Sequence, residues 1–351
     1  MEIGIYTFAD VGIGGIGVSP VQRIPELIEE IALADEIGLD VYGIGEHHRE
    51  GFAAPAPAVI LAAAASRTKN IKLTSAVTVL GSDDPVRVFE QFTAIDLVSS
   101  GRAEVMAGRG ALLDSFRLFG YNLADYDALF EEKLALLLAL RRDAPVTWSG
   151  QFRSPLENEI ILPRPAQPVL PVWLAVGGNP NSIVRAGRLG LPMALAMLGG
   201  HPRRFAPMFE LHRKALTEFG HAPQPAAITV HGFVAESSRM AADIYFPAHN
   251  EVLNRLGAER GIRPSTRRDF DASTGLEGAY MIGSPDELVE QILYQHGLFR
   301  HQRTLIQLAI GSVPHLALMH AIDLLGTKVA PVVRAELMPR TSYSEKTDSA
   351  A

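Results

Sequence analysis

Eight short apolar stretches alternate with longer amphipathic stretches along almost the whole chain. The apolar stretches are rich in branched side chains, as β-strands are, and the stretches between them have a helical period. A strand followed by a helix and another strand predicts parallel pairing, because parallel neighbours need a crossover connection. Eight such units favour a closed (β/α)8 TIM barrel, an α/β fold, over an open sheet. The expected strands are residues 3–8, 41–45, 71–80, 103–108, 171–177, 193–198, 228–235 and 304–310.

The sequence predicts helix N-termini at three places. Ser19 precedes a proline and an apolar stripe, Asp84 precedes another proline, and Ser284 with Glu287 forms a capping box. These caps place helices directly after the expected strands or loops, as a barrel requires. We therefore expect one barrel domain over residues 1–340.

Three stretches depart from the alternation. Residues 146–164 predict a small hairpin that returns through residues 160–162, and residues 239–280 predict an insertion after the seventh strand. Insertions at the C-terminal mouth of a barrel usually form lids. Residues 341–351 are polar and predict a C-terminal tail without fixed structure.

Composition narrows the functional classes. The 351 residues are 47% hydrophobic and carry a net charge of -7, which favours a large core and argues against a surface for nucleic acid or anionic membrane. The sequence contains no cysteine, so redox chemistry would need an organic cofactor or a metal held by His and carboxylates. The longest apolar run, residues 52–65, contains two prolines and is too short to span a bilayer. We expect a soluble, cytoplasmic protein.

The second expected strand ends in Glu46, His47 and His48. Side chains at the carboxyl end of a strand are where α/β enzymes place their chemistry, and the ordinary pKa of histidine suits it to proton transfer at neutral pH. Because side chains alternate along a strand, at most one of the two imidazoles should face the same pocket. The alternative is a pair of solvated loop histidines beside a capping glutamate.

A glycine-rich stretch follows the first strand. Residues 12–17 match a dinucleotide-binding glycine pattern, in which the last glycine lies inside the helix. Here Ser19 marks the helix start after the third glycine, so the stretch predicts a mobile loop at the barrel mouth.

Two strand ends have the features of an anion site. Arg109 lies between two glycines, and arginine offers a permanent charge with donors that fit phosphate oxygens. Gly177 and Gly178 lead into a helix N-terminus, whose free amides bind anions. The alternatives are a surface salt bridge for Arg109 and an ordinary N-cap at Asn181 or Ser182. With the small and branched residues 74–78, these features indicate a pocket for a phosphorylated planar cofactor.

The ordered set of motifs resembles the bacterial luciferase-like monooxygenase family. The motifs fall in the order expected of that family, mainly between about residues 40 and 200. They are residues 46–48, 76–80, 84–87, 97–102, 108–110, 116–120 and 189–192.

The resemblance implies a (β/α)8 barrel that carries FMN, or a deazaflavin in some branches, at its C-terminal mouth. It implies an imidazole needed for chemistry at His47, a cis peptide between Ala76 and Val77, and a phosphate-binding arginine at Arg109. It also implies phosphate contacts from the helix after the fifth strand, at Gly178, Asn179 and Ser182.

Two positions depart from luciferase. Where luciferase has a second phosphate-binding arginine, this chain has Asp125, Tyr126 and Asp127, so Tyr126 is expected to supply a hydroxyl and the anion site is expected to be less basic. Gly108 stands where luciferase has a cysteine near the flavin.

From the resemblance we expect a monooxygenase that takes reduced FMN from a separate flavin reductase and uses dioxygen to oxidise a small organic substrate. His47 would be the acid/base group, and Glu46 would orient it or contact the flavin. No metal ligand set is expected. The expected cofactor-binding residues are Glu46, Thr74, Ala76, Val77, Gly108, Arg109, Tyr126, Gly177, Gly178, Asn179 and Ser182.

Three alternatives stay open. A deazaflavin could occupy the same pocket for hydride transfer, and a barrel without activity could bind flavin beside an active partner. A metal-dependent hydrolase could use Glu46 with His47 or His48, and His231 is a further strand-end candidate. The apolar run 52–65 could serve a homodimer or pack on the barrel wall.

Overall fold

The computed structural model describes residues 1–12, 17–110, 112–259 and 261–338. Most of the predicted glycine-rich loop, residues 13–16, lies outside the described residues. The predicted boundary at residue 340 and the tail 341–351 also lie outside them.

Eight parallel strands close into a barrel, as predicted. Each strand pairs with the next, and the first strand, β1, also pairs with the last, β12. The third predicted strand is divided, because β3 ends at Ser75 and β4 begins at Thr78 and pairs with β5 alone. The barrel strands are β1 (Glu2–Thr7), β2 (Val41–Ile44), β3 (Lys72–Ser75) with β4 (Thr78–Val79), β5 (Ala103–Gly108), β8 (Val172–Val176), β9 (Met193–Met197), β10 (Ala226–Val234) and β12 (Arg303–Gln307).

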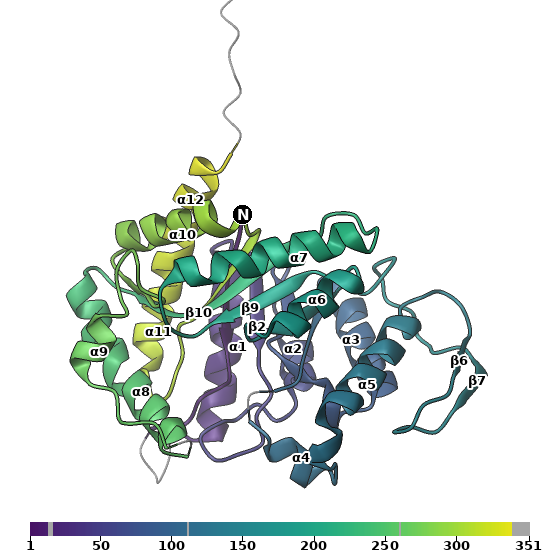
Figure 1. Cartoon of the computed structure of the whole chain (residues 1–351). Coiled ribbons are helices and arrows are strands. Elements are labelled where there is room, and N and C mark those ends of the chain that lie inside the picture. Colours follow the sequence, from purple (N-terminus) through teal and green to yellow (C-terminus); the bar gives the residue numbers. More distant parts are fainter. Residues whose placement is uncertain (13–16, 111, 260, 339–351) are drawn as a thin grey trace, which may run out of the picture.

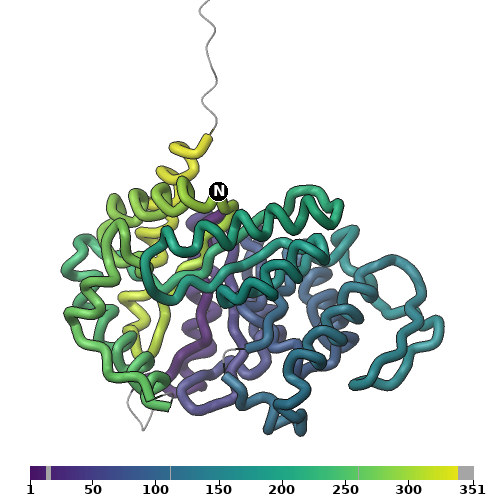
Figure 2. The backbone as a smooth tube through the Cα atoms, in the orientation of Figure 1, coloured from purple at the N-terminus to yellow at the C-terminus, as the bar shows by residue number. Residues whose placement is uncertain are grey.

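Helices surround the barrel (Figures 1 and 2). Ser19, Asp84 and Ser284 cap three of them as predicted, and Glu287 completes the capping box of Ser284. The helices are α1 (Pro20–Glu36), α2 (Pro57–Ala65), α3 (Pro85–Ser99), α4 (Asp114–Leu118), α5 (Tyr126–Leu140), α6 (Pro180–Arg188), α7 (Ala206–Glu218), α8 (Ser238–Ala258), α9 (Arg267–Asp271), α10 (Pro285–Phe299), α11 (His315–Leu324) and α12 (Ala330–Glu336).

The two predicted excursions are present. A hairpin of β6 (Val146–Trp148) and β7 (Leu156–Glu159) projects from one side of the barrel (Figure 1). The return strand, β7, ends at Glu159, before the predicted residues 160–162. The turn between β6 and β7 is therefore shorter than the apolar pattern suggested. The insertion after the seventh barrel strand is helical, with α8 and α9, and the chain then adds β11 (Met281–Gly283) beside β10.

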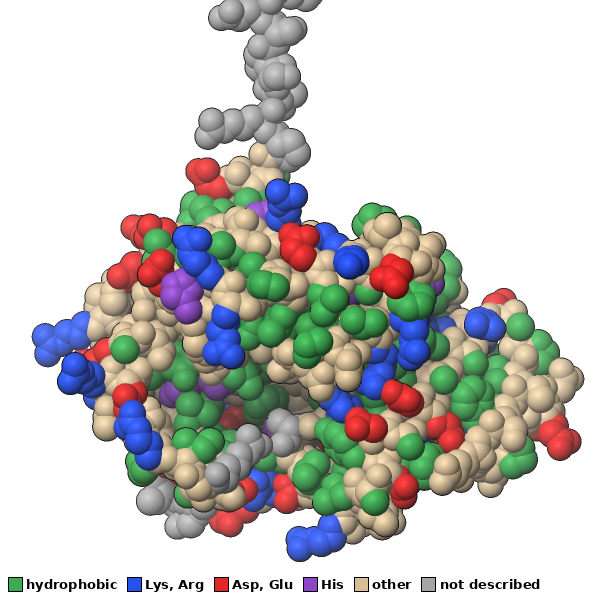
Figure 3. Space-filling model, viewed as in Figure 1, with side chains coloured by type: hydrophobic (Ala, Val, Ile, Leu, Met, Phe, Trp, Pro, Cys, Tyr) green, Lys and Arg blue, Asp and Glu red, His purple; other side chains and the backbone are tan. Residues whose placement is uncertain are grey.

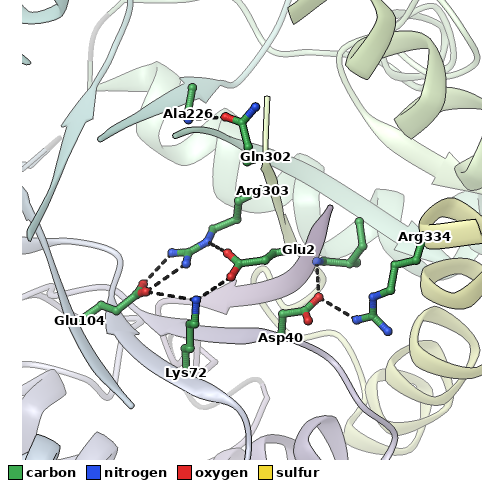
Figure 4. Close-up of polar contacts among 9 residues, drawn as sticks. Glu2, Asp40, Lys72, Glu104, Ala226, Gln302, Arg303 and Arg334 are labelled. Atoms are coloured by element: carbon green, nitrogen blue, oxygen red, sulfur yellow. Dashed lines mark hydrogen bonds and ion pairs between the residues drawn. The ribbon is translucent and has the colours of Figure 1, made fainter. Parts of the chain in front are cut away.

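Charged side chains fill the end of the barrel opposite the mouth (Figure 4). Arg303 is almost fully buried, donates hydrogen bonds to Glu104 at 2.6 and 3.0 Å, and also pairs with Glu2 at 2.7 Å. Lys72 pairs with Glu2 at 2.6 Å. The guanidinium of Arg303 also lies 4.2 Å from the ring centre of Trp173. Two cations and two carboxylates therefore balance one another at this end of the barrel, with Arg303 and Glu104 buried and Lys72 and Glu2 partly exposed.

The apolar run 52–65 packs on the barrel wall. Its helix, α2, contacts α1, α3 and β3 and buries Ile60 and Leu61, whereas Val59 is 68% exposed. The wall packing agrees with one of the two predicted roles, and a homodimer stays a prediction.

One helical stretch of the described residues, His315–Glu336, is apolar and long enough to cross a membrane. It contains α11, a π-helical turn and α12, and it packs against α1 and α10. Since 44% of its most apolar window is buried in the fold, and a core helix passes the same test, the stretch is weak evidence for a membrane span.

Candidate active site

Two adjoining cavities occupy the mouth of the barrel. One, the Arg109 cavity, has a volume of about 310 Å³ and includes Arg109 and Tyr126 in its wall. The other, the Asp10 cavity, has a volume of about 390 Å³ and includes Asp10 and part of the α8 insertion. Four side chains belong to both walls: Tyr6, Phe8, His47 and Leu198. In Figure 3 the lower centre of the molecule is hollowed, with hydrophobic side chains exposed in the hollow.

Small residues form much of the wall of the Arg109 cavity. They come from four barrel strands or their ends: Ala76, Gly108, Ala175, Gly177, Ala194 and Ala196. A Cβ at Gly108 would lie 2.7 Å from the side chain of Val77, so a larger residue would displace that side chain. The cis peptide predicted between Ala76 and Val77 is present. These features leave a smooth, apolar surface against which a planar ring could lie.

His47 stands between the two cavities. Its ring centre lies 4.5 Å from that of Phe8 and 4.4 Å from that of Phe52. Gly45 permits this packing, because a Cβ there would lie 2.3 Å from the ring of Phe8. Burial, with smaller contributions from His48 and Arg49, lowers the pKa of His47 to about 4. The imidazole is therefore neutral near pH 7, with one ring nitrogen able to donate and the other able to accept a hydrogen bond.

Glu46 is held away from His47. One of its carboxylate oxygens lies 2.7 Å from Nε2 of His48, and the other accepts a hydrogen bond from the amide of Val79 at 2.9 Å. The expectation that Glu46 orients His47 is therefore wrong, because alternation along the extended chain places Glu46 and His48 together. Glu46 still lines the Arg109 cavity, which leaves a contact with the cofactor open.

Arg109 lies at one end of its cavity beside the start of α6. Its guanidinium bonds Asp127 at 2.5 Å, donates to Oγ of Ser182 at 3.2 Å and lies 5.3 Å from the ring centre of Tyr126. The Tyr126 hydroxyl donates to the carbonyl of Gly110 at 3.2 Å. The salt bridge that was the alternative for Arg109 is thus present, and the anion site stays a prediction. A bound phosphate would compete with Asp127, whose side chain is 71% exposed.

The remaining predicted cofactor residues do not all line the Arg109 cavity. The side chain of Asn179, rather than Asn181 or Ser182, caps α6, and Gly178 before it has a positive φ of 87°. Thr74 is fully buried, donates to the carbonyl of Ser75 and does not line the Arg109 cavity. A direct contact of Thr74 with a ligand there is therefore not supported, because Thr74 lies on β3 two residues before Ala76, the residue that lines the cavity.

The Asp10 cavity contains residues that the sequence patterns did not select. Asp10 follows β1, Gln307 ends β12, and Val252 and Leu256 come from α8. Asp10 and Gln307 are polar residues at strand ends, so the rule applied to Glu46 and Arg109 could have found them. The α8 residues carry no comparable local signal. They support the prediction that the insertion covers the mouth.

Arg49 connects this insertion to the opposite rim. It forms a two-pronged pair with Glu259, just after α8, at 2.9 and 3.1 Å, and it lies 3.6 Å from Asp114 at the start of α4. The three side chains hold the insertion across the mouth.

The metal-hydrolase alternative lacks its ligand set within the described residues. No three of their His, Asp and Glu side chains are grouped as ligands for one ion. His231, its further candidate, lies 3.0 Å from His249 instead, and burial lowers the pKa of His231 to about 4.

The fold and the placement of both cavities define a (β/α)8 barrel protein with two adjoining cavities at its C-terminal mouth. The model of the luciferase-like monooxygenase family matches residues 1–302, and the chain belongs to this family. A relative with a known activity, limonene 1,2-monooxygenase of Rhodococcus erythropolis, is 25% identical over 327 residues, which cover 90% of this chain and 82% of the relative.

Solved structures share the fold over nearly the whole chain. The monooxygenase RslO1 from Streptomyces bottropensis is 26% identical with a TM-score of 0.83, covering 95% of this chain and 99% of that one. The oxygenating constituent of 3,6-diketocamphane monooxygenase from Pseudomonas putida, in complex with FMN, has a TM-score of 0.77 at 20% identity and covers 94% and 98%. An F420-dependent secondary alcohol dehydrogenase has a TM-score of 0.74 at 18% identity and covers 95% and 99%.

Proposed function

We propose that this protein is a flavin-dependent monooxygenase that uses reduced FMN and dioxygen to oxidise a small organic substrate. The observation that carries the proposal is the pair of adjoining cavities, one ending at Arg109 and one mainly apolar, with His47 between them. Membership of the luciferase-like monooxygenase family and the FMN complex of the diketocamphane enzyme support it.

The residues of the Arg109 cavity fit a phosphorylated flavin. Arg109 and Ser182 would hold the phosphate beside the N-terminus of α6, and the small residues at Ala76, Gly108 and Ala175 would face the ring. A bound flavin supplies the redox chemistry by activating dioxygen. The apolar cavity walls exclude water from the reacting centre, which limits unproductive loss of the activated oxygen.

His47 would move a proton between the cavities. Its neutral imidazole can accept a proton at one ring nitrogen while it donates from the other. Phe8 and Phe52, which both pack against the imidazole, keep the ring in place. Glu46 would contact the flavin or support the cavity wall through His48 and the amide of Val79.

The F420-dependent structural neighbour favours a second candidate, hydride transfer with a deazaflavin. The same cavity would then take a longer cofactor, and dioxygen would have no part in the reaction. For the first candidate we further propose a separate flavin reductase as the source of reduced FMN, a cytoplasmic location, and a homodimer as a possible assembly.

A titration of the purified protein distinguishes the two candidates. Oxidised FMN, anaerobically reduced FMN and F420 are added in turn, and binding is followed by flavin fluorescence or absorbance. The proposal expects reduced FMN to bind, and its oxidation by dioxygen to slow measurably when bound. Binding of F420 with no affinity for either form of FMN would contradict it and favour the second candidate.

A further inference from the structure

The Asp10 cavity has a mainly apolar wall. Phe8, Phe52 and Leu198 come from the barrel mouth, and Val252 and Leu256 come from the covering insertion. Its volume of about 390 Å³ suits a compact organic molecule rather than a polymer or a second nucleotide. An apolar wall binds a ligand through the apolar area that it buries and does not orient the ligand. The orientation of the ligand must therefore come from polar groups in the wall.

Two buried polar side chains in this wall have unused hydrogen-bonding capacity. Asp10 is 3% exposed; its Oδ1 accepts a hydrogen bond from the amide of Gly311 at 2.9 Å, while its Oδ2 has no partner among the described residues. Gln307 is fully buried, and within the same part of the chain neither its amide nitrogen nor its amide oxygen has a partner. Buried polar groups are normally paired, so a carboxylate oxygen and a whole amide left unpaired in one cavity wall point to a partner that enters with a ligand.

The neighbouring polar groups are already engaged. Nδ1 of His231 lies 3.0 Å from Nε2 of His249, and the ring of His231 stacks on Tyr280 with centres 5.7 Å apart. The Tyr245 hydroxyl donates to the backbone carbonyl of Gln307 at 2.9 Å. These contacts fix the surroundings of β10 and β12. Among the described residues of this wall, Asp10 and Gln307 are the ones whose buried side-chain polar atoms lack a partner.

Charge in this region favours a neutral donor over an anion. Two cations act on Asp10, Arg23 and Arg255, and neither lines the cavity. Arg23 is itself paired with Glu30 at 2.7 Å. Arg263, which does line the cavity, is paired with Asp269 at 3.1 Å. Among the described residues of the wall, a ligand carboxylate would therefore meet Asp10 with no unpaired cation beside it, whereas a hydroxyl or N–H group could donate to Oδ2 directly.

We propose that Asp10 and Gln307 are specificity-determining residues, and that the Asp10 cavity takes a compact, mainly apolar substrate carrying a hydroxyl or N–H group. The group donates a hydrogen bond to Oδ2 of Asp10, and the Gln307 amide binds the same group or an adjacent acceptor. That the ligand is a substrate rests on the proposed monooxygenase function. The hydrogen-bond selectivity of the cavity does not depend on that function.

Binding of two matched probes to the flavin-free protein tests this, at a pH above about 8, where Asp10 is ionised despite its raised pKa. 2-Naphthol carries a donor, and 2-methoxynaphthalene has the same ring system without one. Intrinsic probe fluorescence gives both dissociation constants. We expect 2-naphthol to bind roughly tenfold more tightly, the usual scale of one hydrogen bond to a charged or buried partner. Asp10→Asn should reduce this preference to about twofold or less, and Gln307→Leu should reduce it in the same direction.

Two variants of Val252 serve as controls. Val252→Ala removes apolar wall and should weaken both probes alike, whereas Val252→Trp should block both. Asp10→Asn is nearly isosteric, so it carries the test if Gln307→Leu does not fold. Equal affinity for the two probes in the parent protein would overturn the proposal. So would an unchanged preference in Asp10→Asn, which would assign the unpaired groups to bound water. Binding that survives Val252→Trp would place the probes elsewhere and also contradict it.

The probe experiment and the flavin titration test the two proposals independently. The probe measurement contains no flavin, so a protein that binds neither FMN nor F420 could still show the donor preference. A protein that binds reduced FMN but shows no donor preference would retain the proposed function and lose this inference.

Discussion

At the scale of single residues, Arg109 has two competing partners. In this structure its guanidinium is paired with Asp127 at 2.5 Å, and a bound phosphate would take that place. We expect Arg109→Ala to weaken FMN binding by about 2 kcal/mol through loss of a charge-assisted contact, and to leave riboflavin binding nearly unchanged. Asp127→Asn, the matched control, should strengthen FMN binding. Equal weakening of both flavins by Arg109→Ala would show that Arg109 is not at the phosphate.

His47 and His48 differ in what they contact, and their variants should differ accordingly. We expect His47→Ala to keep FMN affinity within a few fold but to lower turnover roughly 100-fold, the scale for a positioned proton-transfer group. His48→Ala should have a much smaller effect on turnover, because His48 contacts Glu46 and Phe119. Single-turnover oxidation of bound reduced FMN with substrate, beside flavin titration, measures both. A larger loss in His48→Ala would move the catalytic role to that residue.

Asp10 should make stability depend on pH. Burial raises the pKa of its carboxyl to about 7, from an ordinary value of 3.8. The folded state therefore holds a proton that the unfolded state releases between about pH 4 and pH 7. Across this window the contribution of Asp10 to the free energy of unfolding should fall as pH rises, by at most about 1.4 kcal/mol per pH unit.

Urea unfolding of the parent protein and Asp10→Asn at pH 4, 5.5 and 7 measures this contribution as a difference between the two proteins. The difference is needed because buried His47 and His231, with pKa values lowered to about 4, make stability rise with pH over part of the same window. A difference that is constant across the three pH values would show that Asp10 titrates normally in the folded protein.

At the scale of the elements, Asp84 joins two of them. Its Oδ1 accepts a hydrogen bond from the amide of Val86 at 2.8 Å and caps α3, while its Oδ2 bonds Arg153, just before β7, at 2.9 Å. We expect Asp84→Ala to lower the free energy of unfolding by about 1 to 2 kcal/mol, mostly through the cap. Asp84→Asn keeps a capping oxygen, so it should cost less than about 1 kcal/mol. Arg153→Ala should match Asp84→Asn, and a loss equal to that of Asp84→Ala would assign the stabilisation to the ion pair.

At the scale of the whole molecule, the buried charges opposite the mouth hold several barrel strands together. Arg303 on β12 pairs with Glu104 on β5 and Glu2 on β1, across the barrel interior. We expect Arg303→Ala to lower the free energy of unfolding by about 3 to 5 kcal/mol, because it leaves the buried Glu104 with Lys72, 3.8 Å away, as its remaining cation. The double variant Arg303→Met with Glu104→Leu should recover much of the loss, since Glu2 and Lys72 still pair. Urea unfolding compares the three proteins, and a double variant less stable than Arg303→Ala would contradict this account.

Local patterns in the sequence predicted the barrel and the strand ends that line its mouth. Strand and helix periodicity and the caps at Ser19, Asp84 and Ser284 are local properties, and their alternation permits few topologies. The alternation along the second strand end likewise predicted that His47 and His48 would face different ways. Polar residues at strand ends are a local signal too, and Arg109 and Ser182 meet as expected from it.

The tertiary structure alone decided which of these residues meet. Closure of the barrel brings Asp10 and Gln307 into one wall although 297 residues separate them, and α8 completes that wall from an insertion with no local signal. Glu46 pairs with His48, and Asp127 reaches Arg109 from another element, which no spacing in the sequence could indicate. A local sequence pattern shows which face of its own strand or helix is buried. Pairing between side chains and the shape of a cavity depend instead on residues that pack together from distant parts of the chain.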